Sequence, residues 1–252
     1  MHALKPSEAP ANVGVLRARR LNRKALVEAL VASTLVTAVV GVGAVLVPKK
    51  HVATFVGFVF LAAVWRLVWT KDDARVREHG LQLGGLLLHD KISLRHLLAE
   101  TARAAAWAAG TAVVIFGPYY LAWRYWWHPE HAFSLDLHPL TEMNEALGQL
   151  LLVALPEEAF YRGYLQTRLD EAFAGRVRFL GASLGPGLLL SSAIFAVGHF
   201  VTVPVPARFA VFFPSLVFGY LRARTRGIGA SLGFHALCNI FSEMLGRAYG
   251  VY

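Results

Sequence analysis

Long apolar stretches dominate the chain and alternate with short segments rich in arginine, lysine and histidine. A helix that crosses ~30 Å of hydrocarbon needs roughly 20 mostly apolar residues. The stretches that meet or approach this length are Leu26–Val47, Val52–Thr70, Ala104–Trp127, Glu145–Leu169, Gly185–Val203, Arg208–Leu221 and Ile228–Leu245. The sixth is the shortest, and the fourth and seventh carry polar residues inside. The pattern predicts an all-α fold, a polytopic transmembrane helix bundle with seven spans.

Basic residues concentrate on one side of the predicted bundle. The sequence contains 25 Lys and Arg residues, and most lie before the first stretch or in every second connection after it. The other connections contain only Lys49, Lys50, Arg208 and Arg247. Cytoplasmic segments of membrane proteins carry the excess of Lys and Arg. We therefore expect a basic cytoplasmic segment at residues 1–25, with the N-terminus inside and the C-terminus outside.

Composition and charge support the same class of protein. Hydrophobic residues make up 56% of the chain and charged residues only 16%, whereas soluble domains have about 25% charged residues. Disorder, a collagen-like chain and an ordinary soluble enzyme are therefore excluded. One cysteine forms no intrachain disulfide and no thiolate metal cage. The net charge of +9 does not indicate nucleic-acid binding, because the basic runs border apolar stretches; the expected partner is the lipid bilayer.

The connections carry weaker signals. Residues 71–103 predict a solvated cytoplasmic loop with a short interfacial helix, whose leucines would lie along the membrane surface: Leu81, Leu83, Leu86, Leu87 and Leu88. An aromatic belt is predicted at the outer end of the third span, from Tyr119, Tyr120, Trp123, Tyr125, Trp126 and Trp127. The next outer loop contains potential metal ligands without regular spacing: His128, Glu130, His131, Asp136 and His138. We interpret it as a solvated loop.

A short string occurs twice, as Gly181–Gly185 and as Gly229–Gly233, both reading Gly-Ala-Ser-Leu-Gly. Each copy fits Gly-x-Ser-x-Gly, a nucleophile motif that needs a strand before it and a helix after it. We expect no strand here. Small residues that let membrane helices pack closely explain both copies better than a serine nucleophile.

Two adjacent carboxylates lie inside the fourth stretch, where an ionisable residue costs at least a few kcal/mol. Glu158 and Arg162 are four residues apart, so they share a helical face and can pair. Glu157 points about 100° away and lacks that partner. It is the candidate general base toward a bound water. The alternative is a purely structural polar cluster that holds helices together.

Two further spans carry polar residues at helical spacing. Phe195 and His199 lie four apart on the fifth span, where a single histidine is as compatible with packing as with catalysis. His235 and Asn239 lie four apart on the seventh span. Such a pair of donors can stabilise an oxyanion, or can serve only as interhelical hydrogen-bonding groups.

Taken in order, Glu-Glu-x-x-x-Arg, Phe-x-x-x-His and His-x-x-x-Asn resemble the motifs of the CPBP family, which includes the CAAX prenyl endopeptidases and bacteriocin-processing proteins. The resemblance covers residues 145–245, which it makes a four-span catalytic core. Residues 26–127 lie outside it as a three-span N-terminal region. The resemblance also extends to bacterial sorting-type members that trim C-terminal anchoring signals.

The resemblance implies an intramembrane endopeptidase that acts near the membrane end of a membrane-anchored or lipidated protein. Glu157 and His199 would activate the catalytic water, and His235 and Asn239 would stabilise the oxyanion. Glu158, Arg162 and Phe195 would support them. These residues belong to one implied site.

Several alternatives stay open. The resemblance implies a metal-free site, whereas Glu157, His199 and His235 would also suffice as ligands of a catalytic zinc ion. A non-enzymatic scaffold or transporter, using the polar cluster for helix packing, is the competing function. The excess of arginine over lysine, 19 against 6, is typical of a GC-rich bacterial genome, so the expected location is the bacterial inner membrane.

Overall fold

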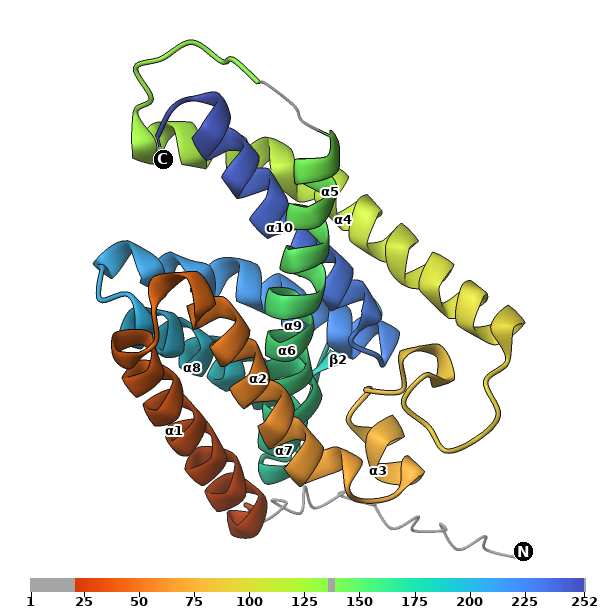
Figure 1. Cartoon of the computed structure of the whole chain (residues 1–252). Helices are drawn as coiled ribbons and strands as arrows, with labels where there is room; N and C mark the ends of the chain where they lie inside the picture. The colour runs from red at the N-terminus through yellow and green to blue at the C-terminus, as the bar shows by residue number, and fades with distance from the viewer. Residues whose placement is uncertain (1–20, 136–138, 252) are drawn as a thin grey trace, which may run out of the picture.

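The computed structural model describes residues 21–135 and 139–251 and is almost entirely helical (Figure 1). Its helices are α1 (Arg23–Leu46), η1 (Lys49–His51), α2 (Val52–Val64), η2 (Trp65–Trp69), α3 (Asp73–Glu78), η3 (Leu83–Gly85), α4 (Leu94–Trp127), α5 (Pro139–Gly148), η4 (Gln149–Ala154), α6 (Leu155–Glu158), η5 (Ala159–Leu165), α7 (Gln166–Ala172), α8 (Pro186–Thr202), η6 (Pro206–Val211), α9 (Phe212–Thr225) and α10 (Gly229–Ala248). Strands β1 (Val177–Phe179) and β2 (Ala182–Leu184) form an antiparallel hairpin. The helical class predicted from the sequence is confirmed, with this hairpin as the exception.

Helix occurs in each of the seven predicted spans. Three helices within the described residues are long and apolar enough to cross a membrane: Arg23–Leu46, Lys49–Trp69 and Leu94–Trp127. Pro186–Thr202 is a shorter apolar helix. The count of seven spans and their orientation stay predictions. Helix α4 begins well before the predicted Ala104, because the Ser93 hydroxyl accepts a hydrogen bond from the His96 amide and caps it.

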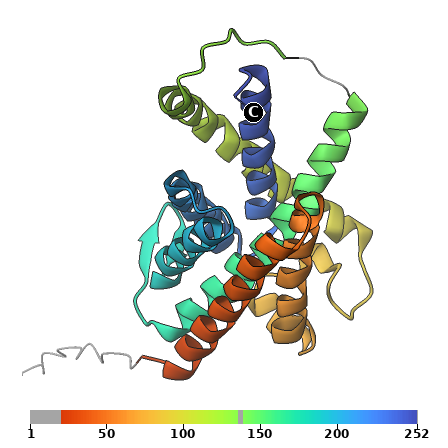
Figure 2. The ribbon, with the colours of Figure 1, turned by 60° about the vertical axis from the view of Figure 1, so that its left-hand side comes forward.

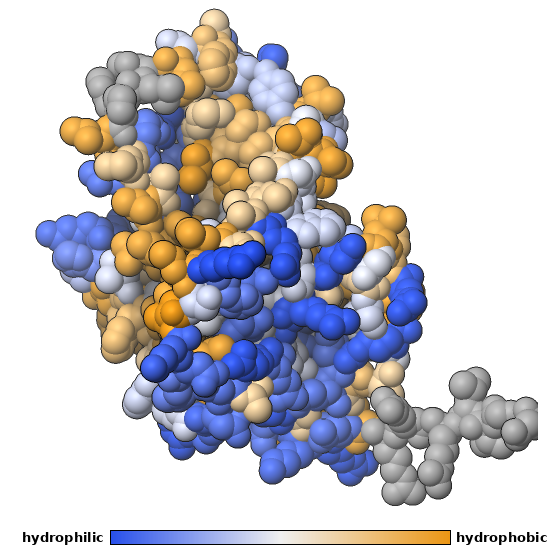
Figure 3. Space-filling view, turned by 90° about the vertical axis from the view of Figure 1, so that its right-hand side faces the viewer, coloured by the Kyte–Doolittle hydropathy of each residue, from blue (hydrophilic) through white to orange (hydrophobic). Residues whose placement is uncertain are grey.

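The outer surface of the long helices is apolar. Leu35 on α1 is 62% exposed and Val113 on α4 is 83% exposed. Figure 3 shows hydrophilic residues gathered over the lower half of one face, with apolar residues above them. An exposed apolar surface of this kind indicates contact with lipid rather than water.

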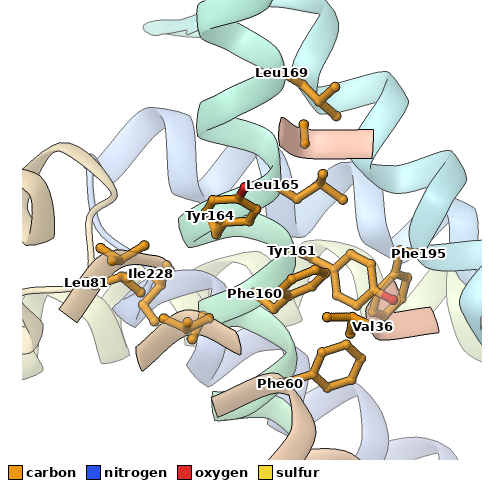
Figure 4. Close-up of a cluster of buried hydrophobic side chains, with 14 of the residues drawn as sticks. Val36, Phe60, Leu81, Phe160, Tyr161, Tyr164, Leu165, Leu169, Phe195 and Ile228 are labelled. Carbon is orange, nitrogen blue, oxygen red and sulfur yellow. The ribbon is translucent and has the colours of Figure 1, made fainter. Parts of the chain in front are cut away.

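The largest buried cluster joins α1, α2, the helix that carries the two glutamates, and α8 (Figure 4). Phe60 lies 5.3 Å from Phe160 and 5.4 Å from Tyr161 between ring centroids. Tyr161 meets the Phe195 ring edge-on at 4.9 Å. Aromatic pairs at these separations prefer tilted and edge-to-face arrangements. The N-terminal helices therefore form one wall around the motif-bearing helices.

Helices α4 and α10 pack closely through small residues. A Cβ atom on Gly229 would lie 3.1 Å from the Ala104 Cβ, and one on Gly233 would lie 3.1 Å from the Ala108 Cβ. This is the close approach expected of small residues between membrane helices. The interpretation of the second Gly-Ala-Ser-Leu-Gly copy as a packing motif is confirmed by these contacts.

The first copy has a different structure, and the expectation of no strand there was wrong. Gly181 forms the turn of the hairpin with a φ of +77°, and Ser183 lies on strand β2. Helix α8 begins at Pro186, one residue after the start of the predicted span Gly185–Val203. Positive φ is accessible to glycine at little cost, so this copy is a turn and a short strand rather than a helix-packing motif.

The segment after α2 is more buried than the sequence predicts. Leu81 is fully buried in the main core and packs against Gly163, where an added Cβ would lie 2.6 Å from the Leu81 Cδ2. The Gly80 carbonyl accepts a hydrogen bond from the Ile228 amide at 3.0 Å. The prediction that Leu81 lies along the membrane surface was therefore wrong, because this residue fills the space between η5 and the start of α10.

The predicted aromatic belt is only half exposed. Tyr125 and Trp126 are exposed, at 78% and 63%. Trp123 is buried and packs against Tyr249 at 5.6 Å between ring centroids. The Tyr120 and Tyr249 hydroxyls are 2.6 Å apart. These contacts join the end of α4 to the end of α10.

Acid is expected to destabilise the protein through His79. The ring is fully buried, its Nδ1 donates to the Arg75 carbonyl oxygen at 2.9 Å, and burial lowers the pKa of His79 to about 4. The unfolded chain takes up this proton near pH 6.5. The free energy of unfolding should therefore fall, by up to about 3 kcal/mol between pH 6.5 and pH 4. Thermal unfolding of the wild type and His79→Gln over this range measures the effect.

His89 provides the matched control, because its hydrogen bond to Asp73 raises the pKa of His89 instead. A raised pKa contributes stability below pH 6.5 that is lost as the pH rises. His89→Gln should therefore retain the acid loss seen in the wild type. An identical acid loss in His79→Gln would contradict the assignment to His79.

Candidate active site

The two glutamates lie on one continuous helical segment, from Pro139 to Ala172, that is irregular on both sides of them. Pro156 lacks an amide hydrogen and leaves the Leu152 carbonyl without its helical donor. The adjacent turns η4 and η5 are wider, π-helical turns. Gly57 on α2 packs closely against this irregular part, since a Cβ atom added to Gly57 would lie 2.6 Å from the Leu152 oxygen. The helix is therefore irregular at its contact with α2, directly beside Glu157.

Glu158 and Arg162 form the pair that their spacing predicts. Arg162 Nη1 lies 3.2 Å from Glu158 Oε1, and both side chains are almost fully buried. Arg162 Nη2 donates to the Ser215 hydroxyl of α9 at 2.8 Å. The guanidinium also lies over the Phe195 ring, 4.4 Å from its centroid. Arg162 thus joins the glutamate helix to α8 and α9.

His235 contacts both glutamates, which the sequence did not predict. Its Nδ1 lies 2.9 Å from Glu158 Oε1 and its Nε2 lies 3.7 Å from Glu157 Oε2. The ring stacks on Phe218 at 4.5 Å. A hydrogen on Nδ1 that donates to Glu158 leaves Nε2 directed at Glu157. His235 is therefore a bridge between the two carboxylates.

His199 and Glu157 line the same cavity, of about 420 Å³. The His199 Nδ1 donates to the Phe195 carbonyl oxygen at 3.0 Å. In a neutral imidazole this leaves the Nε2 lone pair free to accept a hydrogen bond. Glu157 Oε2 is buried and makes no hydrogen bond to any residue that the structure describes. The cavity thus brings together one carboxylate and one imidazole that are each able to hold a water molecule.

Asn239 lies farther along α10 and is held by a residue that sequence reasoning missed. Its Nδ2 donates to Gln149 Oε1 at 3.0 Å, and Gln149 Nε2 donates to Glu243 Oε2 at 3.4 Å. Arg247, one turn later, pairs with Glu142 at 2.9 Å. In Figure 2 the C-terminal half of α10 rises between the end of α4 and α5.

These contacts involve a row of polar residues along one face of α10. Its residues are four apart and face one side: His235, Asn239, Glu243 and Arg247. The spacing was visible in the sequence and could have identified Glu243. The partner Gln149 could not be identified in this way, because it is 90 residues from Asn239 and meets it only through packing.

The part of the chain that contains the two glutamates, His199 and His235 matches a known protein family. Residues 139–241 match the family model described as type II CAAX prenyl endopeptidase Rce1-like. The resemblance inferred from the three motifs is confirmed over this segment, which contains Glu157, His199, His235 and Asn239. No curated protein and no solved structure matches the chain.

The Rce1-like match identifies a protease family whose substrates are membrane-anchored, prenylated proteins. With the apolar helices, it supports a membrane-bound peptide hydrolase. Helices α1 and α2 lie outside the Rce1-like segment, yet Thr37, Val56 and Phe60 line the cavity beside Glu157. The cavity is therefore built from both parts of the chain.

Potential metal ligands lie in two places, the glutamate–histidine cluster and the outer loop. Across residues 21–135 and 139–251, no three His, Cys, Asp or Glu side chains are grouped so as to hold a metal ion. In the outer loop, His128, Glu130 and His131 are described, whereas Asp136 and His138 lie outside the described residues. The His131 ring lies beside Gly250.

Proposed function

We propose that the protein is an intramembrane endopeptidase that hydrolyses a peptide bond near the membrane end of a membrane-anchored or lipidated protein. The observation that carries this proposal is that Glu157 and His199, both within the segment that matches a protease family, line one cavity. The cavity is apolar apart from a few groups, as sites for apolar peptide segments generally are.

The proposed reaction begins with a water held between Glu157 and the His199 Nε2. Glu157 takes one proton from the water while the water oxygen attacks the scissile carbonyl carbon. That carbon becomes tetrahedral, and the former carbonyl oxygen becomes an oxyanion. Asn239 and a His235 that carries a hydrogen on both ring nitrogens are proposed to donate hydrogen bonds to that oxyanion. His235 would donate from Nε2 while its Nδ1 stays on Glu158. Collapse breaks the C–N bond, and Glu157 returns the proton to the leaving amine. Glu158 and Arg162 hold this helix in place and keep His235 oriented.

The resting structure has both oxyanion donors engaged, His235 with the glutamates and Asn239 with Gln149. An amide nitrogen carries two hydrogens, so Asn239 retains one donor while bonded to Gln149. Catalytic hydrogen bonds often tighten only when substrate is bound. His235 and Asn239 are not among the residues that line the cavity of Glu157 and His199. The proposed role therefore needs their side chains to turn toward that cavity when substrate binds, and no new residue.

The test is cleavage of membrane-anchored peptide substrates by purified protein in detergent, with and without a strong zinc chelator. The proposal expects cleavage in both conditions. Cleavage lost with the chelator and restored by zinc would replace the metal-free mechanism with a zinc site at Glu157, His199 and His235. Failure to cleave any anchored peptide, with unchanged folding in Glu157→Gln, would instead support the scaffold or transporter.

Gln149 is expected to act as a positioning residue for Asn239. Gln149→Leu removes the acceptor that holds the Asn239 amide, so kcat should fall about tenfold with KM little changed. This loss is smaller than the ~10²–10³-fold cost of removing an oxyanion donor itself. Steady-state kinetics of Gln149→Leu and Asn239→Ala in the same detergent measure the two effects.

A charge exchange separates positioning from general packing. Gln149→Glu alone places a second carboxylate against Glu243 and should lower kcat. Adding Glu243→Gln restores one donor and one acceptor at the same contact, and kcat should recover. Unchanged kcat in Gln149→Leu, or no recovery in the double variant, would contradict the positioning role.

A further inference from the structure

The cavity beside Glu157 opens at one end of the molecule. Its lining comes from the second half of α1, from η1 and α2, from the glutamate-bearing helical segment, and from the end of α8. The residues nearest these chain turns are Lys49, Thr202 and Val203. Figure 1 shows the α1–α2 turn and the end of α8 together on the left of the molecule. The mouth therefore lies at these two turns.

The arginine-rich connections meet at the opposite ends of the same helices. Asn22, before α1, donates its amide hydrogen to the Ala172 oxygen at 3.0 Å, and Arg168 of α7 pairs with Glu28. Arg222 of α9 donates to the Glu78 carbonyl at 3.0 Å. The segments that carry most of the basic residues thus share one face, which the excess of Lys and Arg marks as cytoplasmic.

We propose that the active-site cavity receives its substrate from the non-cytoplasmic face, and that Lys49 binds a carboxylate of that substrate. This inference rests on the proposed function and on the orientation predicted from the charges. Helices α1 and α8 begin at the arginine-rich end and end at the mouth. The substrate is therefore a membrane-anchored segment exposed outside the cytoplasm.

The lining of the cavity specifies the chemistry of that segment. Apart from Thr37, Glu157, His199 and Tyr161, the inner wall is formed by apolar residues such as Val40, Val56 and Phe60. Lys49 at the mouth is exposed and has no carboxylate partner among residues 21–135 and 139–251. An ammonium group beside an apolar cavity favours a peptide with apolar residues at the cleavage site and a carboxylate next to them.

Cysteine labelling tests the direction of entry without requiring catalysis. Cys238 is the only cysteine of the chain, so Cys238→Ala provides a background free of thiols. Thr202→Cys then marks the mouth, Ser134→Cys marks the outer loop, and Ser183→Cys marks the hairpin at the arginine-rich end. A membrane-impermeant maleimide applied to intact cells should label Thr202→Cys and Ser134→Cys, and should label Ser183→Cys only after the membrane is opened.

The labelling has outcomes that overturn the proposal. Reaction of Thr202→Cys only after the membrane is opened would place the mouth on the cytoplasmic face. Absence of reaction while Ser134→Cys is labelled would show that no open mouth exists there. Reaction of Ser183→Cys in intact cells would show that the orientation of the protein in the membrane is the reverse of the predicted one. A protein that labels as expected yet cleaves nothing would instead overturn only the proposed function.

Lys49→Gln tests whether Lys49 binds a carboxylate of the substrate, and Lys50→Gln is the matched control from the same turn. For anchored peptides with an acidic residue beside the cleavage site, Lys49→Gln should raise KM about fivefold with kcat retained. Amidated and free-acid forms of each peptide distinguish a side-chain carboxylate from a chain end. Equal KM changes for acidic and neutral peptides, or equal changes in Lys50→Gln, would overturn the role of Lys49.

Discussion

Glu157→Gln is expected to lower the rate of peptide cleavage by ~10²–10⁴-fold, the range that a positioned general base contributes. Glutamine keeps the shape and hydrogen-bonding capacity of the side chain but accepts no proton at neutral pH. The residue lines the cavity with His199, and its Oε2 has no hydrogen-bond partner among the described residues. The melting temperature should not fall, because the change also removes a carboxylate that neighbours Glu158.

The measurement is turnover and melting temperature of wild type and Glu157→Gln in the same detergent. His199→Gln serves as the companion variant and should lose activity in the same way. An active Glu157→Gln would remove the base from the mechanism and would favour the non-enzymatic scaffold. A large loss of stability in Glu157→Gln would show that the carboxylate is structural.

Glu158→Gln is expected to lose both activity and stability. It leaves Arg162 buried without its counter-charge and weakens the contact to the His235 Nδ1. Removing one partner of a buried ion pair costs ~3–5 kcal/mol, because the remaining charge is uncompensated. The melting temperature should therefore fall well below that of Glu157→Gln, and the adjacent carboxylates become distinguishable by this one measurement.

Two further variants control for this effect. Glu100→Gln breaks an exposed pair with Arg103 at 3.0 Å, and exposed pairs contribute only ~0.2–1 kcal/mol. Arg162→Met in the Glu158→Gln background removes the orphaned charge and should recover part of the lost stability. Wild-type stability in Glu158→Gln would refute the pairing and leave Arg162 dependent on Ser215 and on the Phe195 ring.

Local spacing accounts for the parts of the site that the sequence predicts correctly. The Glu158–Arg162 pair and the Phe195–His199 contact both follow from residues four apart on one helix, since 3.6 residues per turn place them on one face. The start of α8 at Pro186, one residue inside the predicted span Gly185–Val203, agrees with the tolerance of a first helical turn for proline. None of these features depends on another part of the chain.

Features that join distant segments were not predictable in the same way. His235 reaches Glu158 across 77 positions, and Asn239 reaches Gln149 across 90. Spacing places His235 and Asn239 on one face of α10 but does not specify which helix that face meets. The sequence assigned them to an oxyanion, whereas the resting structure places them against the glutamates and Gln149.

The sequence by itself determined that the chain is helical and apolar enough for a membrane, and which side chains share a helical face. Both follow from interactions within a few turns, where hydrophobic length and helical periodicity act directly. The tertiary structure alone decided that Leu81 enters the core, that Gly181 turns a hairpin and that Glu157 shares a cavity with His199. Each of these depends on which distant surfaces pack together, because burial is a property of neighbouring segments and not of a residue's own position in the chain.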